Sequence, residues 1–474
     1  MAGIGFRISQ LLRSDDLYTR IGGMIASVVL SSGPWLCTII SIGTISIITS
    51  NDLDPQQKQT FRVIINYTYA MSLIGFALLE MVATRYVADT IYVRQEKVLP
   101  TLFSLLSLLI FAIATLFGTL FYWLTGMDWQ TILMASALLS VVTFIWNAMI
   151  FLSCCKDYLA IVLSFIAGTA GSILATWICT RIFHLGLGGQ LLGFLVGQVV
   201  IAACLIYRIF REFGTDFLTP RDFLFHCKHH RMLIFVGLFY ATAIWIDKII
   251  FWVSPSTSER VGSLFYKSSA YDSGMFLAYL FVVPSMAYFL VKIETEFYLS
   301  YRKYFSLIDN RAPLNLIEKG RMELISVTRQ NMAGLCIFQG FITIPALLLA
   351  EQIIESVGLP PIYTTVFRYG LIAASVHMLM QFANILILYF DLPSIVLRNY
   401  FVFLVLNGCL SALSTYMDYR YHGVAYVLAA LAALILSAWS LREVLRDLNF
   451  HIFMKQPFAK PTSIPLILEK VSLK

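Results

Sequence analysis

The chain has 474 residues, of which 59% are hydrophobic and only 13% are charged. Soluble proteins carry about 25% charged residues, so this chain has too few charges to cover a soluble surface. Its 36 Phe, 24 Tyr and 8 Trp exclude a disordered chain, and eight Cys are too sparse for a disulfide-stapled secreted domain. The composition predicts an all-α polytopic membrane protein.

Runs of about 20 mainly apolar residues are long enough to cross a bilayer, and about twelve occur in this chain. The first run is too long for the apolar core of a signal peptide and lacks a small-residue cleavage site, so we interpret it as a span. In chain order the predicted spans are 21–48, 61–87, 99–124, 130–154, 157–181, 187–208, 231–253, 274–299, 332–350, 364–390, 398–416 and 423–445.

The distribution of charge predicts the orientation. With the N-terminus in the cytoplasm, most of the 34 Lys and Arg fall in cytoplasmic segments, as the positive-inside rule requires. Both termini are therefore expected in the cytoplasm. This bias accounts for the net charge of +7, and no nucleic-acid partner is expected. The Cys residues lie in spans or at cytoplasmic edges, so we expect no disulfides.

Two polar segments, 209–230 and 300–331, are the longest between spans, and both are shorter than a catalytic domain of about 100 residues. The segment 209–230 divides the chain into three predicted parts. Residues 1–208 form an N-terminal six-helix bundle, 209–230 a cytoplasmic linker, and 231–474 a C-terminal six-helix bundle with a cytoplasmic tail. Walker A, HExxH and GxSxG motifs are absent from the sequence. We expect no enzyme and no cofactor.

Two short clusters have alternative interpretations. His226, Cys227, His229 and His230 could ligate a metal, but tetrahedral sites usually draw ligands from two separated segments, and a basic loop is the simpler interpretation.

Asp52 and Asp54 could position a metal or an acceptor hydroxyl in a membrane glycosyltransferase. The alternative is a turn with a helix N-cap before Pro55.

Charged residues within spans are costly and often mark a pathway. Asp247 and Lys248 lie in the span 231–253. Sequence neighbours point about 100° apart on a helix, so we expect each to find its own partner on another helix or in a watery cavity. The alternative is that Lys248 snorkels toward an interface marked by Trp245 and Trp252.

The span 274–299 ends in three charged residues. Lys292 and Glu296 are spaced for an i,i+4 ion pair, whereas Glu294 faces elsewhere and is the better functional candidate. In the second span, Glu80 is expected to pair with Arg85.

A polar stripe, His377, Gln381, Asn384 and Asp391, recurs at helical spacing in and after the span 364–390, and should face the bundle interior. His377 either titrates near neutral pH or makes a packing hydrogen bond.

The sequence Ser31-Ser32-Gly33-Pro34 predicts a helix break near the middle of the first span, and Pro284 and Pro345 predict interruptions of two others. Broken helices often line transporter cavities. The alternative is that these prolines are purely structural.

Several short motifs are spread over nearly the whole chain. They are MAGIGF at 1–6, SSGPW at 31–35, TRYVAD at 84–89, WIDK at 245–248, FW at 251–252, YD at 271–272, ETEF at 294–297, YFD at 389–391 and QPF at 456–458. Together these motifs resemble the PelG family, and the likeness runs nearly end to end. Ala243 stands where the family pattern has Gly.

The resemblance implies a member of the flippase superfamily that includes polysaccharide and multidrug exporters, with two six-helix bundles around a central cavity. It implies transport of Pel-type amino-sugar exopolysaccharide from cytoplasm to periplasm across a bacterial inner membrane, during biofilm matrix synthesis. Besides the lipid bilayer, the implied partners are the cytosolic glycosyltransferase PelF and the membrane proteins PelD, a cyclic-di-GMP receptor, and PelE.

We expect spans one, two, seven and eight to line the substrate pathway. Aromatic rings there can stack on sugars, and carboxylates can attract a partly cationic polymer. The predicted pathway residues are Asp247, Glu294, Lys248, Trp245, Tyr240, Tyr67 and His377, with Tyr279 as a further ring and Ser32, Gly33 and Pro34 at the helix break. Two alternatives stay open: a scaffold that docks a glycosyltransferase through 209–230 and 300–331, and a glycosyltransferase that uses Asp52 and Asp54.

Overall fold

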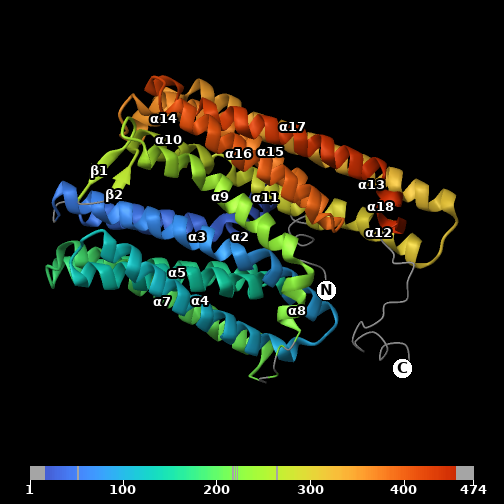
Figure 1. Cartoon of the computed structure of the whole chain (residues 1–474), viewed down its shortest axis with the longest axis horizontal. Helices are drawn as coiled ribbons and strands as arrows, with labels where there is room; N and C mark the ends of the chain where they lie inside the picture. The colour runs from blue at the N-terminus through green and yellow to red at the C-terminus, as the bar shows by residue number, and fades with distance from the viewer. Residues whose placement is uncertain are drawn as a thin grey trace.

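The computed structural model describes residues 17–50, 53–215, 218, 220, 222–262 and 265–454. Almost all of them are helical (Figure 1). The helices of the first half are α2 (Leu17–Ile48), α3 (Pro55–Tyr92), η1 (Glu96–Val98), α4 (Leu99–Leu124), α5 (Trp129–Cys154), α6 (Tyr158–Arg181), α7 (Gly186–Phe213) and α8 (Phe223–His229).

The second half adds one small sheet and a longer set of helices. They are α9 (Arg231–Val253), β1 (Glu259–Val261), β2 (Phe265–Lys267), α10 (Ser269–Leu280), α11 (Val283–Lys292), η2 (Ile293–Phe297), α12 (Tyr298–Asp309), α13 (Leu314–Leu348), α14 (Ala350–Ser356), α15 (Tyr363–Tyr389), α16 (Pro393–Ser414), η3 (Tyr419–Tyr421), α17 (Val424–Arg446) and α18 (Leu448–Met454).

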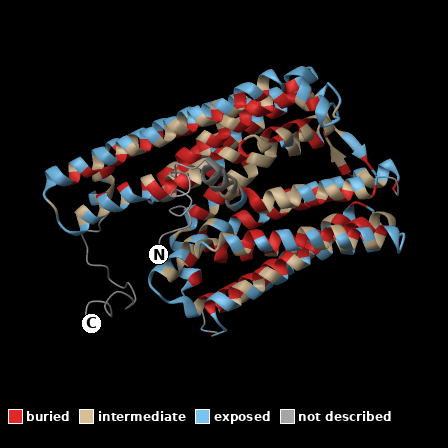
Figure 2. Cartoon of the chain, turned by 180° about the vertical axis from the view of Figure 1, so that it is seen from behind, coloured by how far each residue is buried: buried red, intermediate tan, exposed pale blue. Residues whose placement is uncertain are grey.

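Twelve helical stretches in the described part of the chain are long and apolar enough to cross a membrane, which confirms the predicted number of spans. A helix satisfies its backbone polar groups internally, as hydrocarbon requires. Large apolar side chains cover the outer faces, Leu116 and Phe341 for example being 75% and 77% exposed, whereas buried residues line the inner faces (Figure 2). Such an apolar exterior suits lipid rather than water.

The helices pack in two groups, which we call the N-lobe (α2–α7) and the C-lobe (α9–α17). Within each group neighbouring helices make extensive contacts, and each group has hydrophobic clusters of its own. The main helix contacts between the lobes are α3 against α9 and α2 against α11. That the lobes are separate domains stays a prediction.

Small residues set the closest packing in the N-lobe, between α6 and α7. A Cβ at Gly197 would collide with Ser172, and one at Gly193 would collide with Thr176. Small residues at four-residue spacing allow two membrane helices to approach at backbone distance. Helices α6 and α7 are therefore the most closely packed pair of the N-lobe.

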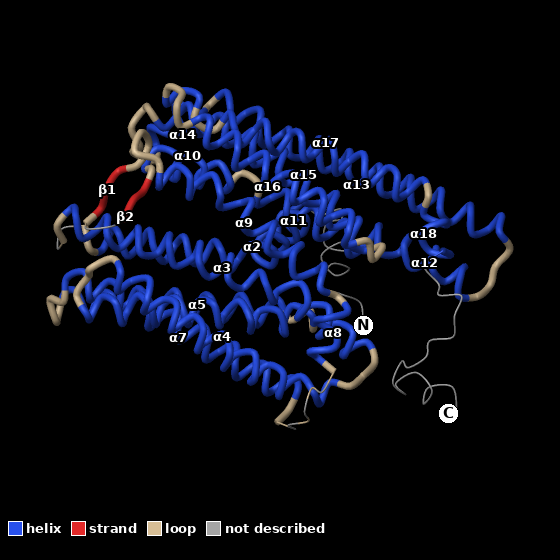
Figure 3. Tube along the Cα trace, viewed as in Figure 1, coloured by secondary structure: helices blue, strands red, loops and turns tan. Residues whose placement is uncertain are grey.

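The prediction of a purely helical chain missed a short hairpin. Strands β1 and β2 pair antiparallel with Arg260 opposite Tyr266 (Figure 3). The side chains of Val261 and Phe265 are buried in an N-lobe cluster that contains Phe61 and Ile64. The hairpin therefore follows α9 of the C-lobe in the sequence but packs against the N-lobe.

The predicted helix breaks have mixed outcomes. Helix α2 runs without interruption through Ser32, Gly33 and Pro34, so the break predicted there is wrong. Pro345 likewise lies inside α13. The eighth span is interrupted instead: α10 ends at Leu280, α11 starts at Val283 with Pro284 in its first turn, and η2 is a π-helix. Proline is tolerated in a first turn because that N–H has no intrahelical acceptor.

Candidate functional site

A buried polar network lies inside the C-lobe. The Asp247 carboxylate of α9 is 0% exposed and accepts a hydrogen bond of 2.6 Å from the Tyr271 hydroxyl. Lys248 Nζ donates to Asp247 Oδ2 at 3.2 Å and to the Ile244 carbonyl at 3.0 Å. The expectation that these neighbours cannot pair is wrong, because the long lysine stem folds back along the helix. A paired carboxylate tolerates burial far better than a lone one.

The network continues through His377 of α15. Its Nδ1 atom is hydrogen-bonded to the hydroxyls of Tyr279 at 2.7 Å and Tyr426 at 2.9 Å, and these two hydroxyls are 2.7 Å apart. Lys248 Nζ lies 5.6 Å from the centre of the Tyr426 ring, which links this cluster to Asp247. The Nε2 atom of His377 has no hydrogen-bond partner among the described residues. We call Asp247, Lys248, Tyr271, Tyr279, His377 and Tyr426 the C-lobe polar network.

The predicted polar stripe faces the C-lobe interior, except for its last residue, Asp391, which is exposed. Asn384 donates to Ser437 at 3.0 Å and accepts from Asn399 at 2.8 Å. Gln381 accepts from the Tyr400 hydroxyl at 2.7 Å. Each buried amide thus has partners on a neighbouring helix, which stabilises helix packing in a membrane.

Aromatic residues join the lobes at one end of the molecule, the hairpin end. The Tyr67 ring of α3 stacks on Trp252 of α9 with centroids 4.6 Å apart, and lies 5.2 Å from the Phe265 ring. The Tyr67 hydroxyl donates to the Tyr266 carbonyl at 3.0 Å, and Trp252 Nε1 donates to Asp272 at 2.9 Å. We call Tyr67, Trp252 and Phe265 the hairpin-end seal.

An ion pair joins the lobes at the opposite end, the α8 end. Arg85 of α3 pairs with Asp391, which follows α15, and lies 3.7 Å from Asp89. The expected pairing of Glu80 with Arg85 is therefore wrong. Glu80 is instead an exposed side chain on α3, a residue that sequence reasoning placed in the wrong role.

Two histidines of the predicted linker lie beside this ion pair. The rings of His226 and His230 are in contact, with centroids 4.4 Å apart and planes tilted by 51°, and His226 also packs on Tyr86 of α3. Burial lowers the pKa of each histidine to about 4, and the Arg85 charge adds to the effect. Both rings are therefore neutral at physiological pH. Among the described residues, no group of three His, Cys, Asp or Glu side chains is placed to hold a metal.

A cleft of about 280 Å³ lies between the lobes. Ser31, Pro34 and Met149 line its N-lobe side, and Met286, Phe289 and Phe382 line its C-lobe side. The predicted helix-break segment thus contributes to an inter-lobe surface although the helix is continuous. The walls are mainly apolar, with few polar groups. Such a surface suits weakly held, extended ligands more than a tightly hydrogen-bonded one.

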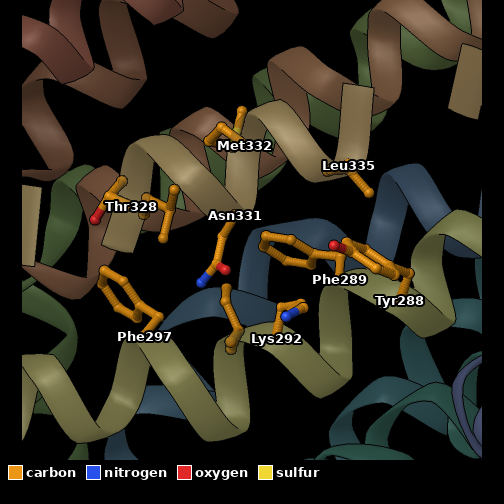
Figure 4. A pocket seen from close by; sticks show the side chains of 10 residues that line it. Tyr288, Phe289, Lys292, Phe297, Thr328, Asn331, Met332 and Leu335 are labelled. Carbon is orange, nitrogen blue, oxygen red and sulfur yellow. The ribbon is translucent and has the colours of Figure 1, made fainter. Parts of the chain in front are cut away.

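A second pocket, of about 10 Å³, lies within the C-lobe between α11, η2 and α13. Figure 4 shows Asn331 directed into it, between Phe297 and Lys292. This volume holds about one water molecule. Lys292 pairs with Glu296 at 2.5 Å, which confirms the predicted i,i+4 pair. Glu294 lies in η2, and its side chain is outside the described part of the chain.

The predicted pathway residues therefore fall in separate places. Asp247, Lys248 and His377 meet in the C-lobe polar network, and the Tyr240 ring lies 5.9 Å from His377. Trp245 lies 6.2 Å from Trp252, next to the hairpin-end seal.

Only one member of the predicted glycosyltransferase pair, Asp54, lies in the described part of the chain. Asp54 is the N-cap residue of α3, but its side chain makes no capping hydrogen bond. Asp52 lies outside the described residues.

Comparison with known proteins now adds to this geometry. A model of one family, described as "PelG: Putative exopolysaccharide Exporter (EPS-E)", matches residues 1–453. The chain belongs to the PelG family. No curated protein matches it. Because the match covers nearly the whole chain, the earlier resemblance is confirmed, and the protein is a membrane transporter rather than an enzyme.

Solved structures with a similar fold are transporters of the MOP superfamily. A multidrug resistance MATE family transporter in an outward-facing conformation is 14% identical, with TM-score 0.62, over 93% of this chain and 98% of that chain. A MOP superfamily transporter from Pyrococcus furiosus is 14% identical, with TM-score 0.63 over the same shares. The Vibrio cholerae MATE transporter VcmN in the bent form is 13% identical, with TM-score 0.60, over 91% and 99%. At such identity the likeness shows the fold alone.

Proposed function

We propose that this protein moves a Pel-type amino-sugar exopolysaccharide from the cytoplasm to the periplasm across the bacterial inner membrane, during synthesis of the biofilm matrix. The observation that carries the proposal is that, besides the packing of α3 on α9 and of α2 on α11, the lobes meet through two different contacts at opposite ends of the molecule, and a cleft lies between the lobes. Opening the two contacts in turn would expose the cleft first to one side and then to the other, with the lobes moving as two bodies.

The two contacts differ in chemistry, and this difference supports the direction. The Arg85–Asp391 pair is partly exposed, its side chains being 31% and 56% accessible. Such pairs contribute about 0–1 kcal/mol. The hairpin-end seal buries Phe265 completely, which stabilises it by several kcal/mol. The α8 end therefore opens more easily. In the predicted topology it faces the cytoplasm, where the polymer is made.

The lining of the inter-lobe surface favours a carbohydrate. Phe289 and Phe382 line the cleft, and opening of the hairpin end would uncover the rings of Tyr67 and Trp252, which stack on each other in this structure. Aromatic faces pack well on the C–H faces of sugar rings without demanding one fixed register. Weak, repeated contacts of this kind suit a polymer that must slide.

The C-lobe polar network has a supporting part in this proposal. Asp247 is fully buried and already paired, so the polymer reaches it only if the network rearranges. We assign Asp247, Lys248 and His377 to coupling C-lobe rearrangement to passage of the polymer. Glu294 stays a proposed pathway residue on η2.

One observation favours a second role, docking of a cytosolic glycosyltransferase such as PelF, with PelD and PelE as membrane partners. Helices α12 and the start of α13 project beyond the N-lobe at the α8 end (Figure 1). Exposed Leu314 and Met322 lie on this projection among basic residues. Charge reversal at Arg311, Lys319 and Arg321 should reduce co-purification of the glycosyltransferase. Intact recruitment would remove this role and leave transport standing.

A reversible cross-link tests transport. Tyr67→Cys and Phe265→Cys introduce thiols on opposite lobes, where the native rings are 5.2 Å apart. Cross-linking should stop polymer secretion, and reduction should restore it. Tyr288→Cys with Phe338→Cys is the matched control, because these stacked rings, 5.1 Å apart, both belong to the C-lobe. Continued secretion by the cross-linked inter-lobe pair would refute movement at the hairpin end.

A further inference from the structure

The motifs FW at 251–252 and YD at 271–272 pair residue by residue between α9 and the start of α10. The rings of Phe251 and Tyr271 stack with centroids 4.1 Å apart and planes 8° from parallel. Trp252 Nε1 donates to both carboxylate oxygens of Asp272, at 3.1 Å and 2.9 Å. Phe251, Trp252 and Tyr271 are almost fully buried. We call these four residues the α9–α10 clasp.

The clasp contacts the C-lobe polar network on one side and the hairpin-end seal on the other. The Tyr271 hydroxyl donates to Asp247 at 2.6 Å, and Trp252 stacks on Tyr67 of the N-lobe at 4.6 Å. Because Tyr271 and Asp272 are neighbours in the sequence, the start of α10 binds both sites. Packed rings and hydrogen bonds therefore run without interruption from the inside of the C-lobe to the lobe interface.

The carboxylate of Asp272 is fixed by the helix that carries it. Asp272 lies in the first turn of α10, where the helix dipole favours a negative charge. It also accepts a hydrogen bond of 3.3 Å from the backbone N–H of Ser268, the N-cap residue of α10. A buried tryptophan needs an acceptor for its N–H. The start of α10 therefore sets the direction of the Trp252 indole, and with it the face that Tyr67 meets.

Helix α10 is a separate segment of twelve residues, because the interruption before α11 divides it from the rest of the span. It also carries a second member of the polar network. Near its other end, Tyr279 is hydrogen-bonded to His377 and Tyr426. A helix moves as a rigid element, so a rearrangement of these hydrogen bonds that displaces α10 also displaces Asp272. The polar network and the acceptor of Trp252 therefore move together.

We propose that Asp272 is a positioning residue that couples the C-lobe polar network to the hairpin-end seal. The inference rests on the proposed transport, in which the hairpin end opens while the polymer passes. When the network rearranges, α10 draws Asp272 away from Trp252, the indole loses its acceptor, and its stacking on Tyr67 is released. Asp272 touches no substrate and acts only through Trp252. Rearrangement inside one lobe thereby opens a contact between the two lobes.

Distances between spin labels at the hairpin end test the positioning role. Trp129→Cys and Tyr416→Cys carry the labels, because both side chains are exposed and lie on different lobes; exposed native cysteines are replaced first. Asp272→Ala should raise the ratio of open to closed populations about tenfold, as loss of a hydrogen bond to a charged group implies. Trp252→Phe keeps an aromatic ring and removes the donor N–H, so it should act similarly, and the two changes together should add little. Glu351→Ala, the matched control, removes a carboxylate from an ion pair within the C-lobe and should leave the distances unchanged.

A double-mutant cycle tests the coupling. Tyr271→Phe removes the hydrogen bond to Asp247 and should raise the same ratio about tenfold. In the Asp272→Ala background it should change the ratio by less than about twofold, because its effect passes through Asp272. Labels at Tyr92→Cys and Leu314→Cys, exposed positions at the α8 end, should gain no longer-distance population in these variants. A merely structural loss would loosen the C-lobe as a whole and lengthen distances at both ends.

The outcomes separate this role from transport itself. Unchanged hairpin-end distances in folded Asp272→Ala and Trp252→Phe variants would refute the positioning role. An equal effect of Tyr271→Phe with and without Asp272 would refute the coupling. Neither result touches transport, which the reversible cross-link between positions 67 and 265 tests by polymer secretion. Should Asp272→Ala not fold, the same cycle is run with Trp252→Phe in its place, because that change leaves the Asp272 carboxylate and the start of α10 intact.

Discussion

Replacing Phe265 by Ala should release the hairpin end of the transporter. The Phe265 side chain belongs to the C-lobe but is 0% exposed within an N-lobe cluster. Its ring lies 5.2 Å from Tyr67 and 6.3 Å from Tyr122. The truncation therefore removes contacts between the hairpin and the N-lobe helices.

The expected magnitude follows from this burial. Truncating a fully buried Phe to Ala costs about 3–5 kcal/mol. The loss falls on the closed arrangement alone, because opening exposes the ring. Since each 1.4 kcal/mol is about a factor of ten in an equilibrium constant, Phe265→Ala should shift the balance toward the open arrangement by about a hundredfold or more.

Distances between spin labels measure this shift. Trp129→Cys in the N-lobe and Tyr416→Cys in the C-lobe are exposed positions at the hairpin end. The exposed native thiols Cys336 and Cys409 are replaced first. Phe265→Ala should add a longer-distance population. Phe341→Ala, which truncates a ring that is 77% exposed, should not. An unchanged distance distribution in a folded Phe265→Ala variant would refute the assigned role of the hairpin.

Three further predictions follow from the other contacts. Arg85→Asp should weaken closure at the α8 end by about 1 kcal/mol or less, because the pair is partly exposed. Adding Asp391→Arg should restore closure, as measured by distances between spin labels at that end. If the double variant shows no rescue, the pair does not hold the lobes together. Tyr271→Phe should lower the free energy of unfolding by about 1.5–3 kcal/mol, because the buried Asp247 loses a hydrogen bond. Lys248→Met should lower it by about 3–5 kcal/mol, because the buried carboxylate loses its partner charge. Denaturant unfolding measures both effects, with the exposed Tyr421→Phe as the control. His226 and His230 have a pKa of about 4 in the folded protein, against an ordinary value of 6.5. The unfolded state therefore binds more protons between these two pH values, and stability should fall as the pH drops from 6.5 to 4. Replacing both histidines by Gln should flatten the dependence of the thermal midpoint on pH.

Hydropathy alone predicted the spans, because the length and apolarity of a membrane helix are properties of one continuous segment. The local Lys292–Glu296 pair followed for the same reason. Arg85 and Asp391 are 306 positions apart in the sequence. A pattern within one segment cannot predict a contact between residues so far apart in the chain.

Other errors came from treating local rules as rigid. The helix-wheel argument separated Asp247 from Lys248 because it ignored the reach of a flexible stem. The proline rule predicted a break at Pro34, yet a single missing N–H is tolerated when the surrounding helix is packed. The hairpin was missed because Val261 and Phe265 gain their stability from the other lobe, not from their own segment.

The chemical difference between the two ends has an experimental consequence. An apolar seal weakens on cooling and responds little to salt, whereas a partly exposed ion pair weakens as ionic strength rises. Temperature and salt thus act as independent controls on opposite ends of one molecule. Cooling in low salt should favour opening at the hairpin end, and warming in high salt should favour opening at the α8 end, so that each arrangement can be enriched without altering a residue.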